Sequence, residues 1–155
     1  MVDALQSQLL MKVLNGTLLA ADTVIPATIR RDPPKVVEGP ILQPEMGVLI
    51  GLAREIRGRL ILESSQAVYS GLSQLMYGMA LEGEMLESFV GELGNMIAGH
   101  MATHVAEDGT DIDISPPTVL VGQTKLTGFR TALLIPLWID GLGSLQVIVV
   151  IDNQK

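Results

Sequence analysis

The chain has 155 residues, of which 48% are apolar and 17% are charged, so it is long and apolar enough to bury one sizeable core. Its net charge of −7 argues against a protein that grips nucleic-acid phosphates through a basic face, and the absence of cysteine excludes disulfides, zinc–thiolate sites and thiol nucleophiles. Residues 1–16 lack a basic segment followed by a continuous apolar run, and no run reaches bilayer length, so we expect a cytoplasmic protein without a membrane segment.

The first half of the chain predicts a helix, a loop marked by prolines and a hairpin. Apolar residues recur every three or four positions over residues 4–21, which is the period of an α-helix. Pro33-Pro34 lies in the next segment and favours a loop with extended pieces. Two apolar runs then flank Arg57-Gly58, so we expect two strands joined by a turn at these residues.

A shorter helix is expected over residues 66–77. Ser64 or Ser65 can cap its start, because a serine oxygen accepts a hydrogen bond from a free backbone N–H group of the first turn. Gly78 is a natural end point, since glycine adopts the left-handed conformation that often follows a helix.

The second half repeats the order of the first. Residues 82–107 predict another long helix, with carboxylates in its first turns, where they suit the helix dipole. Pro116-Pro117 marks an extended segment, and two further apolar runs flank a turn at residues 140–143. Pro136 falls inside the first of these runs, which predicts an edge position or a bulge because proline has no N–H group to donate.

This repeated order predicts an internal duplication with an offset of about 80 residues. In this register Asn15 stands where Asn95 stands, and Lys12 stands where Glu92 stands. We therefore expect one domain, residues 1–155, built from half-repeats of roughly 1–78 and 79–155. The predicted fold class is α/β in the α+β sense, with two long helices packed on a mostly antiparallel sheet and related by a pseudo-twofold axis.

One face of the second long helix is poor in large side chains. At about 100° per residue its aliphatic residues gather on one half and leave a narrow stripe on the other. The stripe and its flank contain Glu84, Ser88, Gly91, Glu92, Asn95 and Gly99. An ordinary solvated face, with glycines that permit close helix packing, is one interpretation. The other is a partner that approaches the backbone closely, which accounts better for glycines that each cost roughly 1 kcal/mol relative to alanine.

Glu92 and Asn95 are the two residues of this stripe best suited to chemistry. They point the same way, one helical turn apart. A carboxylate can pair with a partner's lysine, and an amide both donates and accepts hydrogen bonds without titrating near neutrality. An amide can therefore hold a water molecule in line with a phosphorus atom, as glutamines do in small GTPases.

The pattern Ser88-x-x-x-Glu92-x-x-Asn95, followed by Pro116-Pro117, resembles the active-site pattern of the CheC/CheX/FliY family of chemotaxis phosphatases. The length, the element order and the single Glu-x-x-Asn copy resemble the CheX-like branch, which has the CheC-like fold. Pro117 lies one residue nearer than the spacing typical of the family, so the choice between Pro116 and Pro117 stays open.

The resemblance implies an enzyme, a protein aspartyl-phosphate phosphatase that acts on the phosphorylated CheY-type response regulator. It implies that Asn95 orients the attacking water and that Glu92 contacts a lysine of the regulator. Glu84, Ser88, Gly91 and Gly99 are the expected partner-binding residues. The resemblance further implies a homodimer with no metal of its own, Mg²⁺ being held by the regulator, and neither a nucleic-acid partner nor a membrane.

Two further interpretations are weighed against this one. A non-catalytic domain on the same scaffold could bind or sequester a receiver or a flagellar-switch protein, but it would not need an amide at position 95. His100 and His104 have a spacing compatible with joint metal ligation, yet they lie toward the apolar face without a nearby third ligand. We expect them to be buried or boundary residues, and their role stays open.

Overall fold

The computed structural model describes residues 4–43 and 45–152. Three helices and ten strands follow one another along this part of the chain. They are α1 (Ala4–Val24), β1 (Ile29–Arg31), β2 (Lys35–Glu38), β3 (Ile41–Gln43), β4 (Met46–Arg54), β5 (Gly58–Ser64), α2 (Gln66–Tyr77), α3 (Gly83–Glu107), β6 (Ile112–Ile114), β7 (Thr118–Val121), β8 (Thr124–Leu126), β9 (Phe129–Ile139) and β10 (Gly143–Asp152). Every predicted long element is present.

The strand pairing is symmetric about the contact between β5 and β10. The main sheet has the order β1-β9-β10-β5-β4-β6, with β2 also paired to β9 and β7 also paired to β4, and β3 pairs with β8 separately. All of these pairs are antiparallel. Each half of the chain therefore adds two short strands to the hairpin of the other half. This confirms the predicted fold class and duplication, while the half-repeat bounds at residues 78 and 79 stay a prediction.

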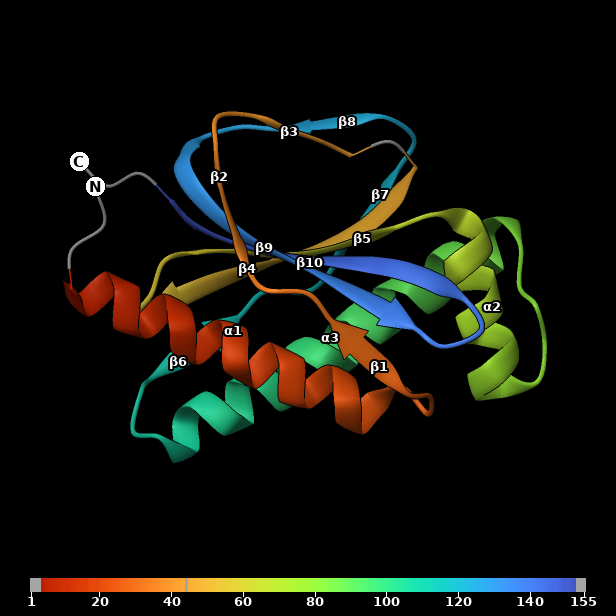
Figure 1. The fold of residues 1–155 in the computed structure, drawn as a ribbon, viewed down its shortest axis with the longest axis horizontal. Helices are drawn as coiled ribbons and strands as arrows, with labels where there is room; N and C mark the ends of the chain where they lie inside the picture. The colour runs from red at the N-terminus through yellow and green to blue at the C-terminus, as the bar shows by residue number, and fades with distance from the viewer. Residues whose placement is uncertain (1–3, 44, 153–155) are drawn as a thin grey trace.

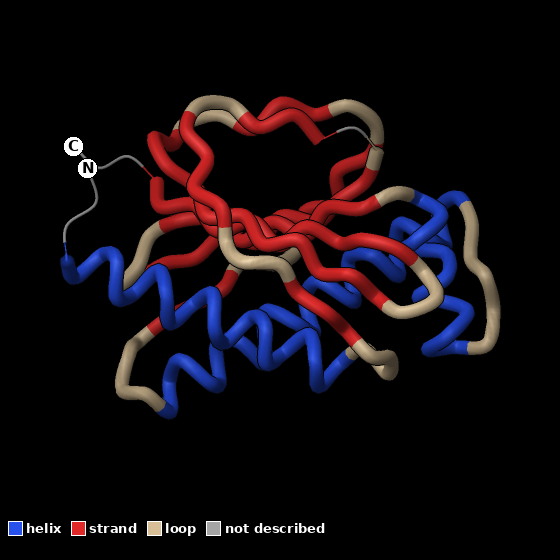
Figure 2. Tube along the Cα trace, viewed as in Figure 1, coloured by secondary structure: helices blue, strands red, loops and turns tan. Residues whose placement is uncertain are grey.

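The elements form three layers, with the main sheet in the middle. Figures 1 and 2 show α1 and α3 side by side against one face, while β3 and β8 arch over the other. The larger apolar core lies between the sheet and the helices. A smaller core, centred on Ile61, Phe129 and Ile148, fills the space under the arch. α2 lies at one end of the sheet and packs on α3.

Local sequence signals account for the bounds of α2. Ser65 is its N-cap, and the Ser65 hydroxyl accepts a 3.1 Å hydrogen bond from the backbone N–H of Val68. Gly78 ends it with a φ of 79°, and its N–H donates to the Gln74 carbonyl. The predicted range of 66–77 is thus confirmed, and Ser65 rather than Ser64 is the cap.

Pro136 lies within β9 at a place where one neighbouring strand is interrupted. β1 pairs with residues 137–139 and β2 with residues 131–134, so Pro136 faces the break between them. The Asp32 N–H donates to the Pro136 carbonyl, and the missing proline N–H points to the same break. Pro136 therefore lacks a regular strand partner on one side, as a residue at a sheet edge does, although β9 itself has neighbouring strands on both sides.

The two long helices differ slightly from their predicted bounds. α1 continues three residues beyond the predicted end at Ala21, and α3 begins at Gly83 rather than at residue 82. Glu82 is instead the N-cap of α3, without a side-chain hydrogen bond. No described helix has the length and hydropathy required to cross a membrane.

Candidate active site

An open groove of about 710 Å³ runs between α3 and the segment that joins β6 to β7. One wall belongs to the helix and the other to the connection that contains both prolines of the Pro116-Pro117 pair. The lining residues are Glu87, Ser88, Gly91, Glu92, Asn95, Ile114, Ser115, Pro116, Pro117 and Val119.

Glu92 and Asn95 lie together on the exposed side of α3 and both line the groove. Among the described residues, neither side chain has a hydrogen-bond or ion-pair partner. Because no contact within the chain occupies these two polar groups, they are available to a molecule that enters from outside. The predicted pair thus lies in one groove.

The glycines of α3 serve two different purposes. A Cβ atom at Gly94 would lie 2.6 Å and 2.7 Å from the methyl carbons of Val48 on β4, and one at Gly91 would lie 3.2 Å from Val119 on β7. Both glycines are buried and let the helix backbone approach the sheet. A Cβ atom at Gly99 would contact nothing within 4 Å. Close packing on the sheet therefore explains Gly91 and Gly94. Of the two glycines that the sequence pattern attributed to a partner's approach, Gly91 and Gly99, only Gly99 leaves the helix surface bare.

The opposite wall of the groove is fixed by Ser115. Its backbone N–H donates to the Gly51 carbonyl over 2.9 Å, and its hydroxyl accepts a 2.7 Å bond from the Gly51 N–H. The same hydroxyl donates to the Pro116 carbonyl over 3.1 Å. These bonds tie the proline pair to β4. Pro117 is the proline that comes near the helix, 4.0 Å from the position of a Cβ atom at Gly91.

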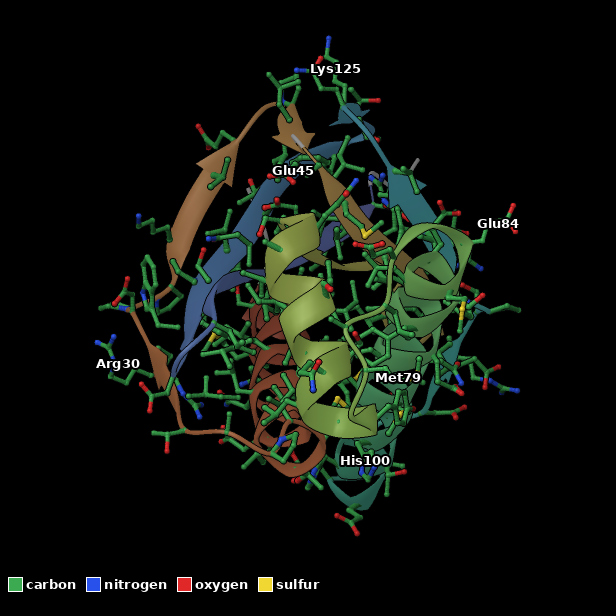
Figure 3. All side chains as sticks on the ribbon, turned by 90° about the vertical axis from the view of Figure 1, so that its right-hand side faces the viewer. Arg30, Glu45, Met79, Glu84, His100 and Lys125 are labelled. Atoms are coloured by element: carbon green, nitrogen blue, oxygen red, sulfur yellow. The ribbon has the colours of Figure 1, made fainter. Side chains whose placement is uncertain are left out.

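The predicted partner-binding residues are only partly brought together. Ser88 and Gly91 line the groove, whereas Glu84 and Gly99 do not. Figure 3 shows Glu84 at the start of α3, projecting outward into solvent. Sequence reasoning missed Glu87, which is half-buried and lines the groove one turn before Gly91. The signal was available, since the helical period places Glu87 and Gly91 on the same flank.

The two histidines lie away from the groove. His100 is exposed near the far end of α3, where it is labelled in Figure 3. His104 is half-buried, with its Nδ1 atom 3.8 Å from a carboxylate oxygen of Glu107. Within the described ranges, no cluster of three or more His, Asp and Glu residues could hold a metal ion.

Comparison with known proteins identifies the family. The family model of the chemotaxis phosphatase CheX matches residues 46–141, which include all of α3 and both walls of the groove. The chain belongs to the CheX family. It is 38% identical over 93 residues to the CheY-P phosphatase CheX of Thermotoga maritima. That alignment covers 57% of this chain and 60% of the relative.

Solved structures share the CheX-family fold over almost the whole chain. A CheC-like superfamily protein from a Shewanella species superimposes with a TM-score of 0.77 and 18% identity, over 92% of this chain and 98% of its own. CheX in the CheX–CheY–BeF3–Mg²⁺ complex from Borrelia burgdorferi gives a TM-score of 0.75 and 19% identity, over 99% and 100%. At these identities the superpositions establish the fold alone.

Proposed function

We propose that this chain hydrolyses the phosphoaspartate of a CheY-type response regulator. The observation that carries the proposal is the pair Glu92 and Asn95, exposed and without partners in the described structure, in the groove of a CheX-family fold. The activity named for the Thermotoga relative and the CheY partner of the Borrelia CheX support the same substrate.

In the proposed reaction a water molecule attacks the phosphorus atom of the acyl phosphate. The bond between phosphorus and the aspartate oxygen breaks, the aspartate carboxylate is regenerated and inorganic phosphate leaves. The Asn95 amide hydrogen-bonds the water and holds it in line with the breaking bond. Because an amide cannot accept the water's proton as a base, that proton goes to the departing phosphate.

Glu92 has a docking role in this proposal. Its carboxylate pairs with a lysine of the regulator near the phosphate and so fixes the depth and angle at which α3 enters. The regulator holds Mg²⁺ against the phosphoryl oxygens, where it neutralises developing charge. The Mg²⁺ of the Borrelia CheX–CheY complex is consistent with that arrangement.

The proposed assembly is a homodimer acting in the cytoplasm on its regulator. The dimer rests on the family resemblance alone, and light scattering coupled to size-exclusion chromatography tests it directly. A mass of one chain at the concentrations used for catalysis would remove the dimer from the proposal without affecting the chemistry at Asn95.

The deciding experiment follows the loss of phosphate from acyl-phosphorylated CheY with Mg²⁺. Asn95→Ala is expected to reduce the acceleration by about 100-fold or more, which is typical of removing one positioned hydrogen-bonding group. Asn15→Ala is the matched control, since Asn15 is the exposed counterpart in α1 and should leave the rate unchanged. A fully active Asn95→Ala variant contradicts the water-positioning role.

Failure of the wild type in this assay would favour the other function. If the wild-type chain binds the phosphorylated regulator but does not shorten the life of its phosphate, the chain is a sequestering module. The alternative predicts that excess chain protects the phosphoaspartate, so the sign of the rate change separates the two functions.

A further inference from the structure

An exposed apolar surface lies beside the groove, on the other flank of the Glu92–Asn95 stripe of α3. We call it the methionine shelf and define it as Tyr77, Met79, Met85 and Met96. Tyr77 is 56% exposed, Met79 59% and Met85 61%, and Met96 is partly exposed. Val36 and Leu42 are more exposed still, at 67% and 74%, so the shelf is distinguished by its place beside Glu92 and Asn95 rather than by exposure alone.

The shelf is continuous with the Glu92–Asn95 stripe. Met85 lies two turns before Glu92 and Met96 one turn after it, so both point within about 40° of its direction on the helix. Tyr77 reaches the same edge of α3 from α2: its ring meets Phe89 edge-on, with centroids 5.6 Å apart. A partner protein that contacts Glu92 and Asn95 therefore has the groove on one side of this contact and the shelf on the other.

The loop that presents Met79 is held in place by α2. The buried Ser73 hydroxyl lies 2.7 Å from the Ser70 carbonyl and 2.9 Å from the Met79 carbonyl, and it accepts a 2.9 Å bond from the Leu81 N–H. The Ser70 hydroxyl donates to the Leu81 carbonyl over 3.0 Å. Figure 3 shows Met79 at the end of α2, on the connection that leads to α3. These bonds hold the backbone of the loop in place while the Met79 side chain stays exposed. Packing within this chain therefore does not account for an apolar residue at this position.

The charged residues in the first half of α3, beside the shelf, are acidic. Residues 60–124, which include α2, α3 and both walls of the groove, contain nine acidic residues and no lysine or arginine. All ten basic residues lie elsewhere in the chain. Arg54 pairs with Asp111 and Asp113, and Lys12 pairs with Asp108. The negative charge near the shelf therefore comes from the glutamates in the first half of α3, and it is complementary to an apolar patch rimmed by basic residues.

We propose that the methionine shelf is the docking surface for the receiver domain whose phosphoaspartate enters the groove. This inference rests on the proposed function, because it assigns the contacts that the same partner makes beside the active site. A stable complex covers about 800 Å² on each partner, more than two polar side chains can supply. The shelf supplies the remaining contact, and its flexible thioethers adapt to the receiver's surface. The partner face it fits carries exposed aliphatic side chains and a net positive rim.

The test compares Met85→Gln with Leu42→Gln. Both residues are exposed apolar side chains, but Leu42 lies on β3, in the arch across the sheet from the helices. The probe is the CheY receiver of the same organism activated with beryllofluoride and Mg²⁺. Met85→Gln is expected to raise Kd about tenfold and to raise KM for phosphate hydrolysis similarly, with kcat within about twofold. Leu42→Gln should leave all three unchanged.

Salt provides the second readout. The acidic field predicts that the association rate constant falls as ionic strength rises, in the wild type and in Met85→Gln alike. Equal Kd values for Met85→Gln, Leu42→Gln and wild type would overturn the docking surface, as would a wild type that does not bind the activated receiver. A wild type that binds but does not hydrolyse contradicts the proposed function only, and the Kd comparison still decides the shelf.

Discussion

α1 and α3 are related by the internal duplication, yet it is α3 that lines the groove with the β6–β7 segment of the sheet. In the register that aligns Asn15 with Asn95, the buried positions of the two helices largely coincide. The pairs buried in both are Leu9/Phe89, Leu10/Val90, Val13/Leu93, Leu14/Gly94, Thr17/Ile97, Leu18/Ala98 and Ala21/Met101. The two helices thus share a core-facing pattern and differ in a few side chains.

Two positions of this register carry a glycine in α3 and a large side chain in α1. Gly91 and Gly94 let α3 pack against β4, β6 and β7, whereas Met11 and Leu14 occupy the corresponding positions of α1. The contacts of α1 with the sheet are mainly to β10. Gly91, which lines the groove, and Gly94, which packs on Val48, therefore distinguish α3 from its counterpart α1.

The largest predicted effect on this comparison comes from Gly94→Ala. The new methyl group would meet the methyl carbons of the fully buried Val48 at 2.6 Å and 2.7 Å, so α3 must move away from β4. We expect a net loss of about 1–2 kcal/mol in the free energy of unfolding, because overpacking outweighs the roughly 1 kcal/mol gained in helix propensity. Urea unfolding measures it.

Gly99→Ala is the control for this prediction in the same helix. Its methyl group would meet open space, so the propensity term acts alone and the variant should gain up to about 1 kcal/mol. Adding Val48→Ala to Gly94→Ala should cost less than the sum of the two single changes, since it removes the clashing atoms. Strict additivity would show that contact with Val48 is not the cause.

Local sequence signals located the three helices and the two hairpins, and they placed the two catalytic candidates on one helix face. The period of apolar residues located α1 and α3, and a serine and a glycine located the two ends of α2. Glu92 and Asn95 could be placed on one face because a helical period fixes the relative direction of residues one turn apart. The duplication followed from the repeated element order.

The groove itself could not be predicted, because its second wall depends on long-range pairing. β6 and β7 add to the hairpin of the other half, and this exchange brings Pro116 and Pro117 opposite α3. The role of Gly94 also depends on which strand residue faces it, and helical periodicity does not identify Val48. Local patterns fix directions along an element, whereas contacts between elements depend on the whole topology.

A smaller effect is expected from Lys12→Glu, which gives α1 the residue type that α3 has at position 92. Lys12 is tied to the far end of α3: its Nζ atom lies 3.7 Å from a carboxylate oxygen of Asp108 and 3.1 Å from the Thr110 hydroxyl. The variant places a carboxylate beside Asp108 and should lose about 0.5–1 kcal/mol in the free energy of unfolding. Lys12→Met, which removes the pair without repulsion, should lose less.

The same substitution tests whether the polar pair is sufficient for activity. We expect no phosphatase activity from Lys12→Glu combined with Asn95→Ala, because Met11 stands where Gly91 opens the groove in α3. The measurement is phosphate release from the acyl-phosphorylated regulator. Activity above that of Asn95→Ala alone would show that the groove wall is dispensable.

The smallest predicted effect concerns the seam between the halves, where β5 pairs with β10. At one end of this seam Arg59 and Asp152 form an ion pair of 2.9 Å. At the other end Glu63 lies opposite Gln146, and burial, followed by the nearby Glu45 carboxylate, raises the pKa of Glu63. Because the pKa of Glu63 is raised in the folded state, the free energy of unfolding falls as the pH rises from the ordinary glutamate pKa through the raised one. The loss is absent below the ordinary pKa, where the carboxyl is protonated in both the folded and the unfolded state.

Glu63→Gln should therefore raise Tm at pH 7 by a few degrees or less, about 3 °C at most, and the gain should vanish below the ordinary glutamate value of about 4.5. Glu45→Gln, which removes only the weaker of the two causes, should give a smaller gain over the same pH window. Thermal unfolding followed by circular dichroism from pH 4 to pH 8 measures both. An equal gain in Tm at every pH would mean that the amide packs better than the acid. In that case the charge of Glu63 would not be what destabilises this end of the seam.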